Sequence, residues 1–214
     1  MKRLNLALLF FFISFLTFGQ SKIPENRDIT IKLPISSFAG DIYAESMGIG
    51  FGLEKMINPS FSFSQEINYI FHVKNNSVLS EDLEDINGVK ITTEIRKYLS
   101  KNETPESGWF INTELKNIFT KSTQEAWTVE SVLIQNKIER YRFILTANCG
   151  MLFYWDKNKD GNLTIELLGG GGLGYINANS SADIESLTIQ SEYNSTNKFY
   201  PCVNFDIKIG YVLK

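Results

Sequence analysis

Residues 61–71 read FSFSQEINYIF, a stretch in which apolar and polar side chains alternate. Its apolar positions are Phe61, Phe63, Ile67, Tyr69 and Phe71. The polar positions between them are Ser62, Ser64, Glu66 and Asn68. Because successive side chains of a β-strand point to opposite sides, this period of two predicts a strand with one apolar and one polar face.

The same alternation recurs along most of the chain, whereas helical periodicity is hard to find. It recurs in the segments 89–99, 109–119, 141–155, 163–175 and 203–213. These predicted strands are roughly 10–15 residues long, while strands of globular proteins average about 5–6. A strand that crosses a bilayer at a tilt needs about 9–11 residues. Strand length therefore favours a membrane barrel over a soluble sandwich.

The connections between these segments alternate in length. Short turns are predicted at 58–59, 100–107 and 156–162, and long polar loops at 72–88, 122–138 and 178–198. Outer-membrane barrels have short periplasmic turns and longer outer loops. If the last strand ends in the periplasm, this parity requires one more strand before Asn58. Residues 28–35, DITIKLPI, supply that strand, with a brief outer connection near 36–40, and the predicted count becomes eight.

The sequence thus predicts an all-β fold, an eight-stranded antiparallel up-and-down transmembrane β-barrel formed by residues 21–214. Residues 1–20, MKRLNLALLFFFISFLTFGQ, combine a basic start with an apolar run and indicate a cleaved signal peptide. No later apolar stretch approaches the roughly 20 residues that a membrane helix needs. The net charge of -3 gives no reason to expect nucleic acid as a partner.

The polar face of the predicted strands carries charges of both signs near mid-strand. In a membrane barrel this face would line the interior, where mixed charges predict an ion-pair network that plugs a narrow lumen. The predicted network consists of Glu54, Glu66, Glu94, Arg96, Glu114, Lys116, Arg142, Glu166, Asp206 and Lys208. The alternative is a secreted, soluble, lipocalin-like barrel, which would turn these charges to water and bind a small apolar ligand inside.

Aromatic residues fall near the ends of the predicted strands, where the interfacial girdles of a membrane barrel lie. They are Tyr43, Phe71, Trp109, Phe119, Tyr141, Trp155, Tyr175, Phe199 and Tyr211. Aromatic residues are also common in the strands of soluble proteins. The girdles therefore add modest support to the membrane interpretation.

Several stretches resemble the small eight-stranded outer-membrane barrels of Bacteroidota, broadly of the OmpA and OmpX type. They are SMGIGFGLEKMINPSFSFSQEINYIF (46–71), EIRKYL (94–99), GWFINTELKNIF (108–119) and VNFDIKIGYVLK (203–214). The resemblance implies an outer-membrane location, with outer-membrane lipid and the barrel-assembly machinery as partners, and no established enzymatic activity. Such barrels often end in an aromatic residue, whereas this chain ends in Leu213 and Lys214.

Motifs that could carry chemistry are few, and no cofactor is predicted. Cys149 and Cys202 fall on opposite faces of their strands, so we expect two free thiols. His72 is the only histidine and could serve a hydrolase at the outer rim only with a neighbouring serine or acid. Residues 169–174, GGGGLG, fit a nucleotide-binding pattern but lack the helix that such a site requires.

Residues 156–167, DKNKDGNLTIEL, begin like a calcium-binding loop. Asp156, Asn158 and Asp160 are spaced as EF-hand ligands, and Gly161 follows them. The twelfth position, where an EF-hand has a bidentate glutamate, is Leu167, and the flanking segments are strands. We interpret the stretch as a periplasmic turn, with weak calcium binding as the alternative.

The sequence predicts a structural or surface-interaction role for the barrel, with a closed, charged interior, no wide pore and no enzymatic turnover. A ligand or protein partner, if there is one, is expected at the outer loops 72–88, 122–138 and 178–198, because loops carry variable function on a rigid scaffold.

Overall fold

The computed structural model describes residues 29–35, 47–58, 60–71, 83–99, 108–127, 133–154, 163–181 and 197–213. All regular structure in these ranges is β-strand. The strands are β1 (Ile29–Pro34), β2 (Met47–Asn58), β3 (Phe61–Phe71), β4 (Leu83–Tyr98), β5 (Gly108–Trp127), β6 (Leu133–Tyr154), β7 (Leu163–Ser180) and β8 (Asn197–Leu213). The predicted signal peptide, residues 1–20, lies outside the described residues.

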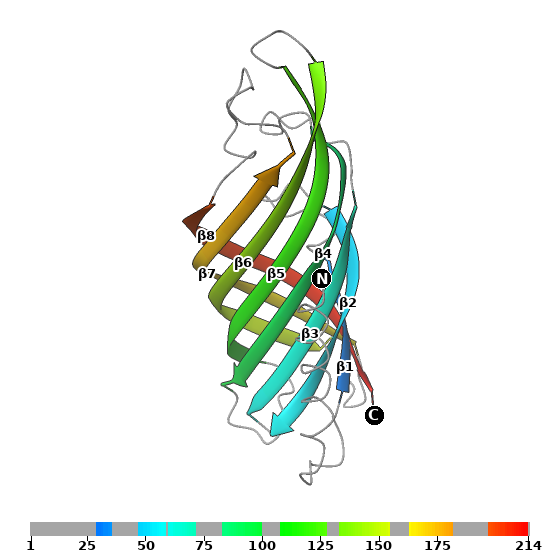
Figure 1. Ribbon diagram of the computed structural model, residues 1–214. Coiled ribbons are helices and arrows are strands. Elements are labelled where there is room, and N and C mark those ends of the chain that lie inside the picture. Colours follow the sequence, from blue (N-terminus) through cyan, green and yellow to red (C-terminus); the bar gives the residue numbers. More distant parts are fainter. Residues whose placement is uncertain are drawn as a thin grey trace.

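Each strand pairs antiparallel with the next along the chain, and β1 pairs antiparallel with β8. The sheet is therefore a closed ring, and Figure 1 shows its strands winding steeply round a common axis. This confirms the predicted all-β, eight-stranded, up-and-down architecture. We call the end where β2–β3, β4–β5 and β6–β7 connect the turn end, and the opposite end the loop end.

The register of the strands determines the geometry of the ring. A row of paired residues that starts at Thr30 on β1 passes through all strands and reaches Cys202 on β8. Thr30 itself pairs with Val212, so the row returns with a stagger of ten residues. For eight strands, this stagger corresponds to a strand tilt of about 40°. A barrel of this size has an interior only wide enough for side chains.

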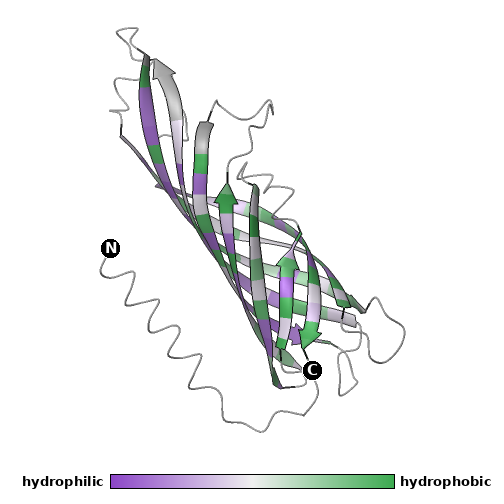
Figure 2. Ribbon diagram, turned by 90° about the vertical axis from the view of Figure 1, so that its right-hand side faces the viewer, coloured by the Kyte–Doolittle hydropathy of each residue, from purple (hydrophilic) through white to green (hydrophobic). Residues whose placement is uncertain are grey.

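The alternation of side chains divides the barrel into a polar inside and an apolar outside. Every buried residue in the described ranges has an even number, so even-numbered side chains point into the lumen from all eight strands. The outward positions include many exposed apolar residues, among them Phe51, Ile95 and Phe205. Figure 2 shows the resulting bands of hydrophilic and hydrophobic residues along the strands.

Two connections differ from the prediction because strands continue into them. The segment 122–138 was expected to be a loop, but β5 and β6 stay paired up to Trp127 and Leu133. Alternation there is weak, yet threonine and isoleucine favour extended backbone, and the two strands satisfy each other's hydrogen bonds. Figure 1 shows this ribbon rising beyond the other strands. The predicted loop 72–88 is likewise shortened, because β4 begins at Leu83.

The other connections agree more closely. The loop predicted at 178–198 falls between Ser180 and Asn197. At the turn end, the side-chain oxygen of Asn58 accepts hydrogen bonds from the backbone N–H groups of Ser60 and Phe61, at 2.9 and 3.0 Å. An asparagine that binds the backbone in this way stabilises a tight turn. The brief connection expected near 36–40 lies outside the described residues, between β1 and the start of β2 at Met47.

Gly150 makes room for a large lumen side chain. A Cβ atom at Gly150 would lie 2.3 Å from the ring of Phe110, whereas a Cβ atom at Gly169, on the outer face, would meet nothing closer than 3.7 Å. Phe110 is completely buried, so its ring has little freedom to move. Close packing inside the barrel therefore depends on the missing side chain at Gly150.

Substitution Gly150→Ala is expected to lower the free energy of unfolding by about 1–3 kcal/mol, the usual cost of overpacking. Gly169→Ala is the matched control and should leave stability nearly unchanged. Urea unfolding followed by tryptophan fluorescence would measure both variants. Equal stability of the two would contradict the proposed packing role of Gly150.

Candidate functional site: the barrel lumen

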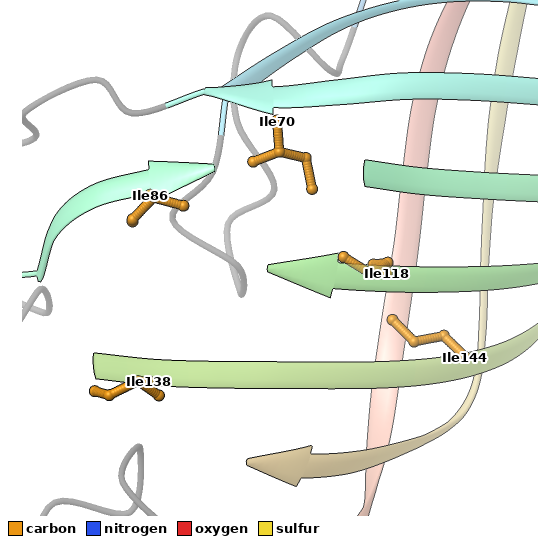
Figure 3. Packing of buried hydrophobic residues seen from close by; sticks show 5 residues of the cluster. All are labelled: Ile70, Ile86, Ile118, Ile138 and Ile144. Atoms are coloured by element: carbon orange, nitrogen blue, oxygen red, sulfur yellow. The ribbon is translucent and has the colours of Figure 1, made fainter. Parts of the chain in front are cut away.

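The lumen is built in layers along the barrel axis. At the turn end, the apolar side chains of Tyr98, Phe110, Leu152 and Leu168 pack together, with Met56 against them. Toward the loop end, five isoleucines from β3, β4, β5 and β6 form a second apolar cluster, shown in Figure 3. They are Ile70, Ile86, Ile118, Ile138 and Ile144. The charged residues lie between these two apolar layers.

Lys32 on β1 joins two glutamates in the part of the charged layer that is nearer the turn end. Its Nζ atom lies 2.6 Å from Glu54 Oε2 and 2.9 Å from Glu166 Oε1. Lys32 is completely buried, and both glutamates are at most 4% exposed. Glu54 lies on β2, which pairs with β1, and Glu166 lies on β7, which does not, so this one ammonium joins strands on both sides of β1.

Arg96 on β4 binds a glutamate of its own strand and one of β7, a strand with which β4 does not pair. Its Nη2 atom lies 2.6 Å from Glu94 Oε1 and 2.8 Å from Glu166 Oε2. The guanidinium also lies over the ring of Phe110, 3.9 Å from the ring centroid. A planar cation can use its edge for carboxylates and its face for an aromatic ring. Arg96 therefore connects the charged layer to the apolar layer at the turn end.

Lys208 on β8 is surrounded by four acidic side chains. Its Nζ atom lies 2.5 Å from Glu66, 3.1 Å from Glu94 and 3.5 Å from Glu114, which belong to β3, β4 and β5. Asp206 on the same strand is 3.7 Å away. Lys208 is completely buried, so no water screens these contacts.

Neutral groups satisfy the remaining oxygens of the network. The Tyr98 hydroxyl donates to Glu54 Oε1 at 2.7 Å, and the Ser62 hydroxyl donates to the same atom. Asn112 Nδ2 donates to Glu94 Oε1 at 2.6 Å. On the loop side, Lys116 Nζ donates to Asn204 Oδ1 at 2.7 Å, while Asn204 Nδ2 donates to Glu114 Oε2 at 2.7 Å. Dense hydrogen bonding of this kind is what allows so many charges to be buried.

Of the ten charges predicted for the lumen, the structure brings nine into one network. They are Glu54, Glu66, Glu94, Arg96, Glu114, Lys116, Glu166, Asp206 and Lys208. Arg142 also faces the lumen and is buried, but it lies nearer the loop end and takes no part in these ion pairs. Sequence reasoning missed Lys32, although its position between Ile31 and Leu33 on β1 assigns it to the polar face of the strand.

The remaining sequence motifs are placed as follows. Cys149 points outward and Cys202 inward, and both are free thiols, as predicted. Residues 169–174 lie wholly within β7, which continues as a strand to Ser180. His72 and the candidate calcium ligands Asp156, Asn158 and Asp160 lie outside the described residues. Within the described ranges, no group of three or more histidine, cysteine or acidic residues could hold a metal ion.

Substitution Lys208→Met is expected to destabilise the barrel by about 3–5 kcal/mol, because it leaves buried carboxylates without their cation. The matched control is Lys121→Met. Lys121 Nζ lies 2.5 Å from Glu139 Oε1, but both side chains are more than half exposed. Removing such a surface pair costs about 0–1 kcal/mol. Equal urea midpoints for the two variants would show that the buried contacts of Lys208 carry no special weight.

The chain was compared with protein families, curated proteins and solved structures. No family model, no curated protein and no solved structure matches it. In the part of the chain that the structure describes, no helix is long and apolar enough to cross a membrane. The interpretation of this barrel therefore depends on its own geometry.

Proposed function

We propose that the protein is an outer-membrane β-barrel with a structural or surface-interaction role and a closed, charged interior. The observation that carries this proposal is the reversed polarity of the barrel. Its lumen buries charges such as Glu114, Glu166 and Lys208, while its outer face exposes residues such as Phe51, Trp109 and Leu145. Water favours the opposite arrangement, whereas a hydrocarbon environment favours this one.

The height of the apolar outer face supports the proposal. On β5, outward apolar residues extend from Trp109 to Phe119, and Lys121 follows them. Ten residues of a strand tilted by about 40° rise about 25 Å along the barrel axis. That height is close to the apolar band of outer-membrane barrels, about 25 Å.

Aromatic side chains support two interfaces. Toward the turn end, Trp109 and Tyr211 are about half exposed, at 56% and 49%. Toward the loop end, Phe119 pairs with Tyr141, and the rings of Tyr175 and Phe199 lie 5.0 Å apart. Aromatic rings with a polar edge favour the boundary between hydrocarbon and water. These two groups lie where such boundaries would fall.

A soluble, lipocalin-like barrel fits the structure less well. Such a barrel needs an apolar interior for its ligand and a polar exterior for solubility. Here the lumen is occupied by ion pairs and by two separate apolar clusters of buried side chains, one on either side of them. The same arrangement supports a closed interior rather than a wide pore.

The interaction part of the proposed role is assigned to the loop end. The β5–β6 ribbon extends there beyond the pairing of β6 with β7, which ends at Ile138 and Ser180. Long protruding strands and loops on a rigid ring can present a surface to partners outside the cell. The lipid of the outer membrane and the assembly machinery are the partners that the proposed location implies.

The location is tested by fractionation together with an outward charge. Wild type is expected in the outer-membrane fraction, extractable only with detergent. Leu145→Arg, in the middle of the apolar face, should lower stability in lipid by about 2–4 kcal/mol, whereas Gln135→Arg on the ribbon should have little effect. Recovery of the wild-type protein in the soluble periplasm without detergent would sink the proposal.

The closed interior is tested by conductance in planar lipid bilayers. The wild-type protein should give no large, stable channels, because buried side chains cross its lumen. Removing two bridging cations in the double variant Lys32→Met, Lys208→Met should raise the frequency of openings. A large, steady conductance of the wild type would contradict the proposed plug.

A further inference from the structure

Arg142 is a buried cation with no partner in the described part of the chain. Its side chain is 7% exposed and points into the lumen from β6. No ion pair, hydrogen bond or ring contact joins it to any described residue, and its Nε atom is buried without a hydrogen-bond acceptor. In the sheet it lies between Ile118 on β5 and Ile176 on β7.

This situation differs sharply from that of the other lumen arginine. Arg96 is as deeply buried, yet its guanidinium has Glu94 and Glu166 within 2.8 Å. A buried charge without a counter-charge is costly, so proteins normally pair it or use it to bind a ligand. The sequence could easily have placed methionine or leucine among these isoleucines instead.

The surroundings of Arg142 reinforce its positive charge. On the loop side of the row that contains Glu66 and Lys116, the described inward positions with charged side chains are basic: Lys90, Arg140, Arg142 and Lys198. Lys90 and Arg142 lie on either side of Ile118 in a single row of the sheet. Charges of one sign in a narrow, low-dielectric mouth concentrate ions of the other sign.

A second unpartnered polar group faces the lumen from another strand. Asn68 on β3 is 1% exposed, and neither its amide nitrogen nor its oxygen has a hydrogen-bond partner. Asn68 lies three strands from Arg142 in the ring. A buried polar side chain without a partner calls for an explanation, and an unseen ligand is one.

We propose that the loop-side lumen binds a small oxyanion, a carboxylate or a phosphate, through Arg142. The guanidinium donates two parallel N–H groups, which match two oxygens of such an anion. The anion enters from the loop end, because the ion pairs around Lys208 block the other side.

The proposal concerns the lumen alone and holds whether or not the barrel lies in a membrane. Binding is measured by isothermal titration calorimetry on the purified full chain in zwitterionic detergent, without other multivalent anions. Inorganic phosphate is the probe in one arm and succinate in the other. The arm that shows saturable binding identifies the oxyanion class.

Arg142→Met is expected to weaken binding by about tenfold or more, the loss of a charge-assisted pair of hydrogen bonds. Arg142→Lys should bind with intermediate affinity, because it keeps the positive charge but loses the two parallel N–H donors of the guanidinium. Lys97→Met, which removes an outward cation near the turn end, is the control and should bind like wild type. Heat-modifiability on gels verifies that every variant is folded.

A stability measurement separates binding from a purely structural role. Phosphate or succinate should raise the urea midpoint of wild type but leave that of Arg142→Met unchanged, because only the form that binds is stabilised. Failure of folded wild type to bind either anion, or equal affinity of wild type and Arg142→Met, would overturn the proposal. A Lys97→Met variant that lost as much binding affinity as Arg142→Met would also overturn the proposal.

Discussion

The pairing of charges across a narrow lumen is the constraint on which the rest of this structure depends. Closing eight strands with a stagger of ten residues leaves an interior that only side chains can fill. Once acidic residues occupy that interior, each needs a cation from another strand. Lys32, Arg96 and Lys208 supply these cations. Their contacts with Glu166 and Glu66 join strands that never pair in the sheet.

This constraint also explains how far the sequence could predict the fold. Alternation with a period of two survives in stretches such as 61–71 because one face must be apolar and the other must take part in the network. The strand count and the polar face were therefore predictable. The tip of the ribbon beyond Gln124 and Asn136 was not predictable. Its two strands pair only with each other there, so neither face has to line a lumen or meet an apolar environment.

The candidate site was predictable in its members but not in its connections. Nine of the ten predicted charges meet in one network, since a shared polar face brings them into one lumen. Their partners depend on the register between strands, which no single segment contains. Thus the role of Lys32, which lies on the shortest described strand, became visible only in three dimensions. The same holds for the isoleucine layer, which interrupts the polar face at Ile70 and Ile118.

Register also accounts for the difference between the two lumen arginines. Both are inward residues that follow an outward hydrophobic residue, Ile95 before Arg96 and Tyr141 before Arg142, and this local pattern does not separate them. The stagger of the ring places Arg96 beside Glu94 and Glu166, but raises Arg142 to a level where the inward neighbours on adjacent strands are Ile118 and Ile176. The network gives Lys32, Arg96 and Lys208 at least two carboxylates each, whereas no ion pair joins Arg142 to any described residue. That contrast is the physical basis for treating the loop-side lumen as a binding site, and the charged layer below it as a plug.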